Sequence, residues 1–357
     1  MHTKTHLAAF TCAEGQPLQL QARPTPSPGP GELLVAVKSV ALNPADVIMR
    51  NQGLFIQSYP TVTGFDTAGL VLAVGDDVPP PFRQGIRIAA YASSVWKGCS
   101  PDYGAFQERC LVPWQHATVL PNDISWLHAA TLPVAVQVPL SAWDTMNITQ
   151  ARGTTAVTAT KREALLIWGA SSSVGTMGVQ TARLLRDDSH TSIAAVYATA
   201  GAANIEYVSL LGADRVFDYK DSQVANAIIS AARQDGLAIW HCFLATGDLR
   251  ICQAVLRAFL GGEKTTMIAS APPIPSDAEV VKGIETLFLV PPMEEAQRLE
   301  QFRNWMAWLG ESLARATIRP SPEPNVVGKG LGAINAGLDR LQQGVICWAY
   351  CIVIIYF

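Results

Sequence analysis

The 357-residue sequence has few charged residues, and the two signs nearly balance. Aspartate, glutamate, lysine and arginine make up 15% of the chain, and the formal net charge is −3. Proteins that bind nucleic acid normally gather lysine and arginine on one face or segment. Because this chain has no such basic cluster, we expect no nucleic-acid partner.

The sequence also lacks the long apolar segments of exported and membrane proteins. Residues 1–10, MHTKTHLAAF, contain no apolar core of the length that a secretory signal needs. The apolar run at 345–357, VICWAYCIVIIYF, is shorter than the roughly 20 residues of a membrane-spanning helix. We expect no membrane segment, and we interpret 345–357 as a buried last strand; the alternative is a run that packs poorly.

Metal-binding and disulfide patterns are missing as well. The seven cysteines are scattered, their number is odd, and no two form a CxxC pair. Such a set indicates neither a disulfide framework nor a cysteine-based zinc site. The six histidines are equally scattered, so we expect no metal, and a reducing cytoplasm fits the cysteine pattern best.

The most informative segment is residues 165–178, LLIWGASSSVGTMG. Four apolar residues at 165–168 are typical of a buried parallel strand, and a small-residue turn and a helical pattern follow them. A strand, a tight turn and a helix N-terminus form the first unit of a dinucleotide-binding fold, in which free backbone N–H groups bind a pyrophosphate. Of the G-x-G-x-x-G fingerprint, mapped onto Ala170, Ser172 and Gly175, only the last glycine is kept, so an ordinary strand–helix turn is the alternative.

The following residues repeat this alternation of strand and helix. Strands are predicted at 192–200, 215–219, 238–244 and 261–270, and helices at 204–213, 223–233 and 248–259. Alternating strands and helices of this length predict a parallel, doubly wound sheet. The chain is long enough for a second domain, and its first 130 residues, dense in proline and glycine with strands predicted at 33–43 and 70–78, indicate an irregular β domain. Helical patterns return at 302–320 and 330–344.

Three motifs give the sequence a family resemblance. ALNPAD at 41–46, YPTVTGFDTAGLVLAVGDDV at 59–78 and YGAFQERCLVP at 103–113 are similar to the catalytic domain of medium-chain dehydrogenase/reductases. Within that family the sequence resembles the zinc-free quinone oxidoreductases and enoyl reductases, including stand-alone fungal enoyl reductases that serve polyketide synthases. The resemblance runs over about 5–343 and implies an α/β protein: a GroES-like β-rich catalytic domain at 1–130 and 291–357, and a Rossmann domain with a doubly wound parallel sheet at 131–290.

The resemblance also bears on zinc. Zinc-dependent relatives have a cysteine at the position of Asp46 and a histidine at that of Phe65, and their four-cysteine lobe corresponds to a region with Cys99 alone. A catalytic zinc site needs about three protein ligands and a structural site four. The resemblance therefore implies an enzyme without zinc.

The cofactor implied by the resemblance is NADPH. Ser172, Ser173, Val174 and Gly175 are the predicted pyrophosphate contacts, and Thr199 stands where NAD-specific relatives have an acidic residue that binds the ribose. NADP-dependent relatives have a serine at 201, a lysine at 203 and a tyrosine at 219. Only Tyr219 matches, so we expect a weakened preference for NADPH; a partly buried tyrosine at a strand end is the alternative for Tyr219.

At the nicotinamide end, the resemblance implies that Asn43 and Asp46 of the N-P-x-D motif line or support the active cleft. Equally, either residue could cap the local turn, because Asn-Pro is a turn signal in its own right. Three polar positions of relatives are apolar here, at Ile48, Phe55 and Val138. No acid, base or nucleophile replaces them.

We therefore expect an NADPH-dependent oxidoreductase that reduces an activated C=C bond in an enoyl thioester, enone or quinone-like compound, in fungal secondary metabolism. The expected partners are a small-molecule or carrier-bound acyl substrate, a polyketide synthase and a second copy in a homodimer. The alternatives are a family member that catalyses a redox-neutral isomerisation or cyclisation, and a non-catalytic partner of a synthase.

Overall fold

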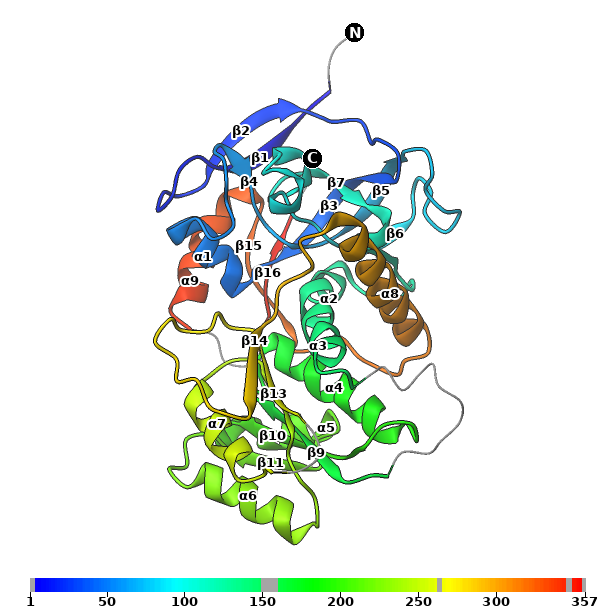
Figure 1. The fold of residues 1–357 in the computed structure, drawn as a ribbon. Coiled ribbons are helices and arrows are strands. Elements are labelled where there is room, and N and C mark those ends of the chain that lie inside the picture. Colours follow the sequence, from blue (N-terminus) through cyan, green and yellow to red (C-terminus); the bar gives the residue numbers. More distant parts are fainter. Residues whose placement is uncertain (1–3, 149–159, 262–264, 345–348, 355–357) are drawn as a thin grey trace. The chain divides into compact units, whose positions relative to one another are not determined.

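The computed structural model describes residues 4–148, 160–261, 265–344 and 349–354 (Figure 1). The chain divides into two compact units: Met1–Val134 together with Pro292–Phe357, and Ala135–Pro291. We call them the first and second units and describe each by itself. The six cysteines within the described residues are free thiols. None of the helices in the described residues combines the length and the apolar character that crossing a bilayer requires.

The second unit is built on a parallel sheet of six strands. Their order is β11-β10-β9-β12-β13-β14 (Arg215–Asp218, Ile193–Ala200, Glu163–Trp168, His241–Leu244, Thr266–Ser270 and Ile284–Phe288). Numbered along the chain, this is the order 3-2-1-4-5-6 of a Rossmann fold, which reverses direction between β9 and β12. The predicted doubly wound parallel sheet is confirmed.

The helices of the second unit cover both faces of this sheet. They are α3 (Pro133–Thr145, which starts at the end of the first unit), α4 (Ser173–Asp187), α5 (Ile205–Leu210), α6 (Val224–Gln234) and α7 (Leu249–Arg257), with a short helix η5 (Ala202–Asn204). Successive residues of β9 belong to different clusters: Leu165 and Ile167 pack with α4, whereas Leu166 packs with α6 and α7. Burial on both faces is why the strand is an uninterrupted apolar run.

The first unit is mostly β structure. A sheet of three strands has the order β2-β1-β4 (Gln19–Pro24, Thr5–Thr11 and Thr61–Val62). A sheet of seven has the order β15-β16-β3-β5-β6-β8, with β7 paired to β3 (Pro324–Lys329, Ala349–Val353, Glu32–Ala41, Asp66–Val74, Arg87–Tyr91, Ala117–Val119 and Arg109–Pro113). The helices are α1 (Pro44–Gln52), α2 (Trp126–Ala130), α8 (Glu295–Ala314) and α9 (Ile334–Gln342), with short helices η1 (Val95–Lys97), η2 (Pro101–Tyr103), η3 (Trp114–His116) and η6 (Leu331–Ala333). The expected GroES-like β-rich domain is confirmed.

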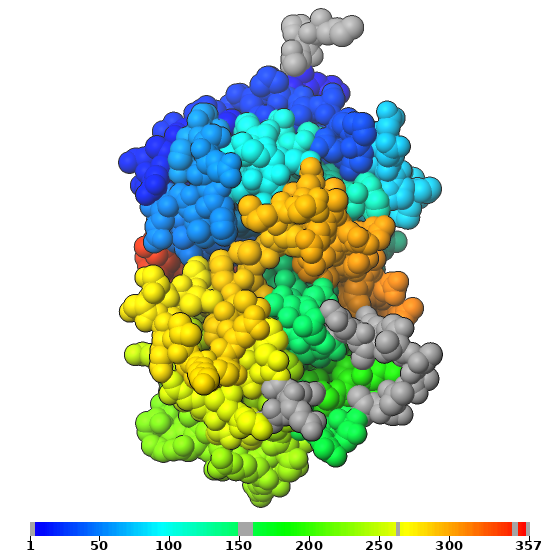
Figure 2. Space-filling model, in the orientation of Figure 1, coloured from blue at the N-terminus to red at the C-terminus, as the bar shows by residue number. Residues whose placement is uncertain are grey.

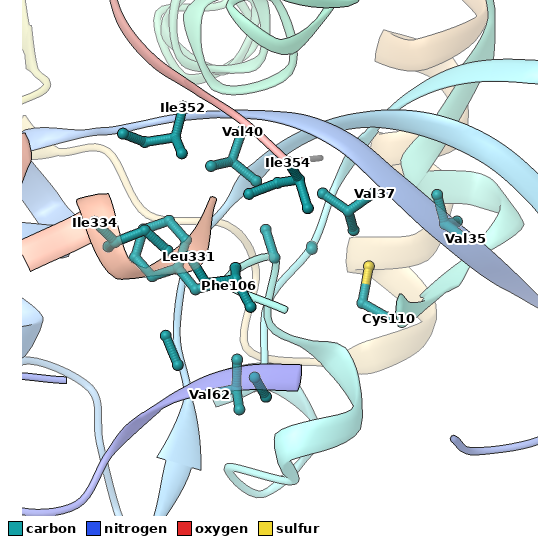
Figure 3. Close-up of a cluster of buried hydrophobic side chains, with 14 of the residues drawn as sticks. Val35, Val37, Val40, Val62, Phe106, Cys110, Leu331, Ile334, Ile352 and Ile354 are labelled. Atoms are coloured by element: carbon teal, nitrogen blue, oxygen red, sulfur yellow. The ribbon is translucent and has the colours of Figure 1, made fainter. Parts of the chain in front are cut away.

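The apolar tail forms a strand inside this sheet. β16 is parallel to β15 on one side and antiparallel to β3 on the other. Ile352 and Ile354 lie beside Val37 and Val40 of β3, in a cluster that also contains Phe106 (Figure 3). The prediction of a buried last strand is confirmed for 349–353; residues 345–348 and 355–357 lie outside the described residues.

Helix α8 begins earlier than the sequence pattern predicts. The apolar spacing indicates a helix from 302, whereas α8 starts at Glu295 because the Glu294 carboxylate accepts the backbone N–H groups of Ala296 and Gln297. Its surface, orange in Figure 2, lies against the cyan surface that includes η1, and Lys97 Nζ is 2.7 Å from Glu295 Oε1.

Candidate functional site

The turn between β9 and α4 is shaped by hydrogen bonds of Ser172. Ser172 is the N-cap residue of α4: its Oγ accepts the Gly175 N–H at 3.1 Å and donates to the Gly169 carbonyl at 2.8 Å. The Ser172 side chain is therefore already used in both directions. Its role is to hold the turn.

Three glycines make this turn tight. Gly169 has a φ of +78°, a conformation that side chains disfavour. A Cβ atom at Gly175 would lie 2.3 Å from the Gly169 carbonyl oxygen, and one at Gly178 would lie 2.9 Å from the Phe243 ring. The six-residue fingerprint mapped onto Ala170, Ser172 and Gly175 does not include Gly169, the glycine that directly follows the strand.

The first two N–H groups of α4 have no partner within the helix. They belong to Ser173 and Val174, which occupy the first two helical positions. The first turn of α4 contains no acidic residue. Two unused donors and the positive end of the helix dipole favour a phosphate group at this position.

Thr199 supports the turn from the neighbouring strand. Its side chain is 0% exposed, its Oγ1 accepts the Gly169 N–H at 3.0 Å, and its carbonyl accepts the Ala170 N–H at 2.8 Å. The hydroxyl of Thr199, which we predicted as a cofactor-binding residue, therefore has a buried backbone partner. This geometry favours a positioning role for Thr199.

Tyr219 lies at the end of β11, next to the end of β10. It is 39% exposed, and its backbone N–H donates to the Ala200 carbonyl at 3.3 Å. A Cβ atom at Gly201 would lie 3.6 Å from the Tyr219 ring, an ordinary contact. The positions that discriminate between NADPH and NADH in relatives, Gly201 and Tyr219, are therefore neighbours, and Ala203 is exposed on η5.

In the first unit, Asn43 and Asp46 both lie at the N-terminus of α1. Asn43 is the N-cap residue, and its backbone N–H donates to Asp46 Oδ2 at 2.7 Å. The other Asp46 oxygen, Oδ1, is buried and has no hydrogen-bond partner among the described residues. Asp46 therefore has the capping role that we kept as one of two alternatives.

Asn43 also contacts a second carboxylate, which sequence reasoning did not single out. Asn43 Nδ2 donates to Asp66 Oδ2 at 3.0 Å, and the backbone N–H of Val134 donates to Asp66 Oδ1 at 2.8 Å. We call Asn43, Asp46 and Asp66 the α1 cluster. Its members are 23 residues apart or less in sequence, and the pairing of β5 with β3, which places Asp66 opposite Ala41, brings Asp66 to Asn43.

Burial dominates the acidity of the α1 cluster. It raises the pKa of Asp46 to about 8, which the backbone hydrogen bond from Asn43 opposes and the nearby charge of Asp66 reinforces. Burial likewise raises the pKa of Asp66 to about 7, against the hydrogen bonds from Asn43 and Val134. Both carboxyl groups thus titrate near neutral pH.

The positions that hold zinc in relatives have other contacts here. Phe65 stacks on Tyr91 with ring centroids 5.4 Å apart, and the Cys99 thiol accepts the Gln57 N–H at 3.2 Å. No three His, Cys, Asp or Glu residues within the described ranges are grouped as a metal site would require.

One of the apolar replacements in the first unit, Phe55, sits near an aromatic group. Phe55 is 41% exposed, with a φ of +63° and its ring centroid 6.3 Å from that of Trp96. The guanidinium of Arg298 lies over the Trp96 ring, 5.0 Å from the ring centroid. Ile48 is half-buried on α1, and Val138, in the second unit, is half-buried on α3. Phe55 and Trp96 offer an apolar, partly exposed surface.

The predicted residues thus form two groups. The β9–α4 turn brings Ser172, Ser173, Val174 and Gly175 together with Thr199, and Tyr219 follows on the next strand but one. Asn43 and Asp46 belong to the first unit with Asp66.

Comparisons with known proteins identify the family of this chain. Residues 29–122 match the family model of the alcohol dehydrogenase GroES-like domain. The trans-enoyl reductase tndF of Aspergillus flavipes is 37% identical over 346 residues, covering 96% of this chain and 97% of the relative. The trans-enoyl reductase tazE of Aspergillus terreus is 38% identical over 301 residues, covering 83% of this chain and 95% of the relative.

A solved structure is similar in fold. The crystal structure of the CurK enoyl reductase superposes with a TM-score of 0.75 at 17% identity, covering 98% of this chain and 99% of that chain.

Proposed function

Since the chain belongs to the medium-chain dehydrogenase/reductase family, in the branch that contains fungal trans-enoyl reductases, we propose that it is an NADPH-dependent reductase of an activated C=C bond. The observation that carries the proposal is the β9–α4 turn. It keeps the glycine geometry and the unused N–H groups of a dinucleotide site at the point where the strand order reverses.

The residues of the second unit fit a bound dinucleotide. The N–H groups of Ser173 and Val174 would bind the pyrophosphate, and Gly169 and Gly175 leave the space that a Cβ atom would fill. Thr199 would hold the turn in place through the hydrogen bond from the Gly169 N–H to its hydroxyl. When bound, the reduced nicotinamide supplies a hydride.

The choice of NADPH over NADH is supported by what stands at the ends of β10 and β11. A carboxylate at the end of the second strand repels a 2′-phosphate, and Thr199 carries no charge. Tyr219 is exposed enough to pack against an adenosine ribose, whereas Gly201 and Ala203 offer no charge or hydroxyl. The preference for NADPH is therefore modest.

In the first unit, the surface of Phe55 and Trp96 would bind an apolar acyl chain, and Asn43 would provide a hydrogen bond to the bound ligand. Conjugate reduction adds a hydride to the β-carbon and a proton to the α-carbon. The described residues provide no exposed acid dedicated to that proton, so water would deliver it. The names of the relatives support an enoyl substrate. We propose that this substrate is small or bound to the carrier of a polyketide synthase, and that the enzyme works in the cytoplasm. The homodimer stays a prediction.

The direct test has two steps. Purified protein is titrated with NADPH and with NADH while nicotinamide fluorescence is recorded, and 2-enoyl thioesters of increasing chain length are then added while absorbance at the nicotinamide band is followed. We expect micromolar binding of NADPH, weaker binding of NADH, and consumption of NADPH with medium-length or longer enoyl chains. Absence of binding of either dinucleotide up to about millimolar concentration would reject the proposal.

A matched pair of glycine variants links binding to the turn. Gly175→Val should abolish the fluorescence change, because the Cβ of the new side chain would clash with the Gly169 carbonyl oxygen and distort the turn. Gly332→Ala serves as control, since its Cβ would meet no atom closer than 3.8 Å. Equal binding by both variants would place the dinucleotide elsewhere.

A second function is favoured by Ile48, Phe55 and Val138, where polar side chains of relatives are missing. A redox-neutral isomerisation or cyclisation of a polyketide-like intermediate needs apolar enclosure and no hydride. Product of unchanged mass, formed without added nicotinamide, would favour this function over the reductase. Stable co-purification with a synthase and no turnover would favour the non-catalytic partner.

A further inference from the structure

The α1 cluster contains two buried carboxylates that the reduction proposed above does not use as acid or base. Asp46 and Asp66 are 0% and 2% exposed, and neither has a cationic partner among the described residues. An ionised carboxylate is costly to bury unless hydrogen bonds or a proton compensate for the lost water.

The two carboxylates differ in how many of their oxygens are used. Asp66 accepts one N–H on each oxygen, from Asn43 Nδ2 at 3.0 Å and from the Val134 backbone at 2.8 Å. Asp46 accepts one on Oδ2 at 2.7 Å, and its Oδ1 is buried without a partner among the described residues. Two donors stabilise an ionised carboxylate, whereas an oxygen without a donor gains nothing from the charge.

We propose that Asp66 is a positioning residue, which as an ionised double acceptor fixes the orientation of the Asn43 carboxamide, and that Asp46 is held as a neutral acid. An ionised carboxylate only accepts hydrogen bonds, so it must face the NH2 arm of the amide. The carbonyl oxygen of Asn43 is then the acceptor that the side chain offers to a ligand. This inference rests on the proposed function in one respect, the contact between Asn43 and the bound ligand.

Two further titratable groups face the pair, Tyr91 from β6 and Cys351 from β16. Burial raises the pKa of the Cys351 thiol to about 12 and raises that of the Tyr91 hydroxyl above its ordinary value. Both are neutral between pH 5 and pH 9. Within that range, a titration observed at Asn43 therefore reports Asp66 and Asp46.

The first experiment needs no ligand and no activity. Protein labelled with 15N-asparagine is examined by NMR, and the side-chain signal of Asn43 is identified by its loss in Asn43→Ala. In the wild type, we expect this signal to shift between pH 5 and pH 9 as Asp66 ionises. Asp46→Asn should keep the signal near its wild-type position at pH 8, and Asp66→Asn should displace it. A wild-type signal that does not respond to pH, or one that Asp46→Asn displaces and Asp66→Asn does not, overturns the proposal.

The second experiment uses the reaction. Asp66→Asn should lower kcat about tenfold, the usual scale for one mispositioned hydrogen bond, with the dissociation constant of NADPH within about threefold of the wild type. The double variant Asn43→Ala/Asp66→Asn should be no slower than Asn43→Ala, because Asp66 acts only through Asn43. Asp76→Asn, at an exposed turn position of the first unit, is the matched control and should leave kcat unchanged.

The two experiments fail separately. Multiplicative losses in the double variant would show that Asp66 acts independently of Asn43 and would overturn the positioning role. If no dinucleotide binds and no enoyl compound is reduced, the proposed function fails while the NMR arm still decides how Asn43 is held. If Asp66→Asn does not fold, the pH response of the wild type and of Asp46→Asn decides alone.

Discussion

The N-termini of α4 and α1 both have backbone N–H groups without a partner in the helix, but the two ends differ in the acidic residues near these groups. At α4 the cap is a neutral serine, the first turn has no acidic residue, and the N–H groups of Ser173 and Val174 are left over. At α1 the third helical residue is Asp46, whose carboxylate folds back onto the Asn43 N–H, with Asp66 close by. The first helix is open to an external anion, and the second is closed by the protein's own acids.

The difference separates a binding role from a positioning role. An anion is attracted to a helix N-terminus only where no acidic side chain of the protein already occupies that position. Both segments have the sequence pattern of a turn followed by a helix, but only the N-terminus of α4 is suited to bind an anion. The deciding difference is one acidic residue in the first helical turn, Asp46, which is present in α1 and has no counterpart in α4.

The largest effect is expected when α4 is made to resemble α1. Val174→Asp places a carboxylate in the first turn of α4, where it competes with a pyrophosphate and repels it. We expect NADPH affinity to fall about 100-fold, since like charges in contact cost several kcal/mol. Titration of nicotinamide fluorescence measures the loss. The neutral, similarly shaped Val174→Asn is the control, and a loss of equal size there would mean that shape, and not charge, matters.

The reverse change at α1 should stabilise the protein in a pH-dependent way. The pKa of Asp46 is raised to about 8 in the folded state, so its contribution to stability is fully present below about pH 4 and is lost as pH rises through 8. Asparagine does not titrate, so Asp46→Asn should gain on the wild type as pH rises from about 4, reaching several kcal/mol at pH 8. Chemical denaturation at pH 5 and pH 8 measures the difference. A constant difference between the two proteins would contradict the neutral state of Asp46.

A smaller effect is expected from adding charge near the open helix. Gly201→Ser with Ala203→Lys restores the residues that the resemblance assigns to NADP-dependent relatives, and the Gly201 Cβ has room beside Tyr219. A charge-assisted hydrogen bond to a 2′-phosphate should tighten NADPH binding about tenfold and leave NADH binding unchanged. Parallel titrations with the two dinucleotides provide the readout. Equal tightening of both would show that the added residues do not meet the 2′-phosphate.

The smallest effect concerns the support of the β9–α4 turn. Thr199→Val keeps the shape of the side chain and removes the acceptor of the buried Gly169 N–H. We expect about 1 kcal/mol lower stability and a NADPH affinity reduced by about fivefold. Thr199→Ser keeps the hydroxyl and should bind like the wild type. Identical behaviour of the valine and serine variants would remove the positioning role of Thr199.

The sequence carries the elements that depend on local patterns. The strand at 165–168, the turn after it and the alternation that follows were predictable because burial of β9 on both faces favours apolar residues, which occupy 164–168. The strand at 349–353 was predictable for the same reason, although its neighbours β15 and β3 were not. The family resemblance supplied the second domain.

Contacts between residues distant in the chain could not be predicted from the sequence. Nothing in the sequence pairs Asp66 with Asn43 or with the Val134 backbone, which is 68 residues from Asp66. Those hydrogen bonds exist only after β5 has paired with β3 and the start of α3 has reached Asp66. We assigned Thr199 to the cofactor because the sequence does not reveal its backbone partner, Gly169, which lies in the turn after a different strand, β9. Burial and pairing, which decide such roles, are properties of the fold.

The position of β16 has a consequence for how the protein is made. The strands of the second unit all lie between Glu163 and Phe288, so that unit has its complete sheet while synthesis continues. The seven-stranded sheet needs β16 between β15 and β3, and β3 is translated about 300 residues earlier. On the ribosome, β3 therefore waits with an open edge until residues 349–353 emerge, and this interval is where a chaperone would bind and where a stalled chain would aggregate.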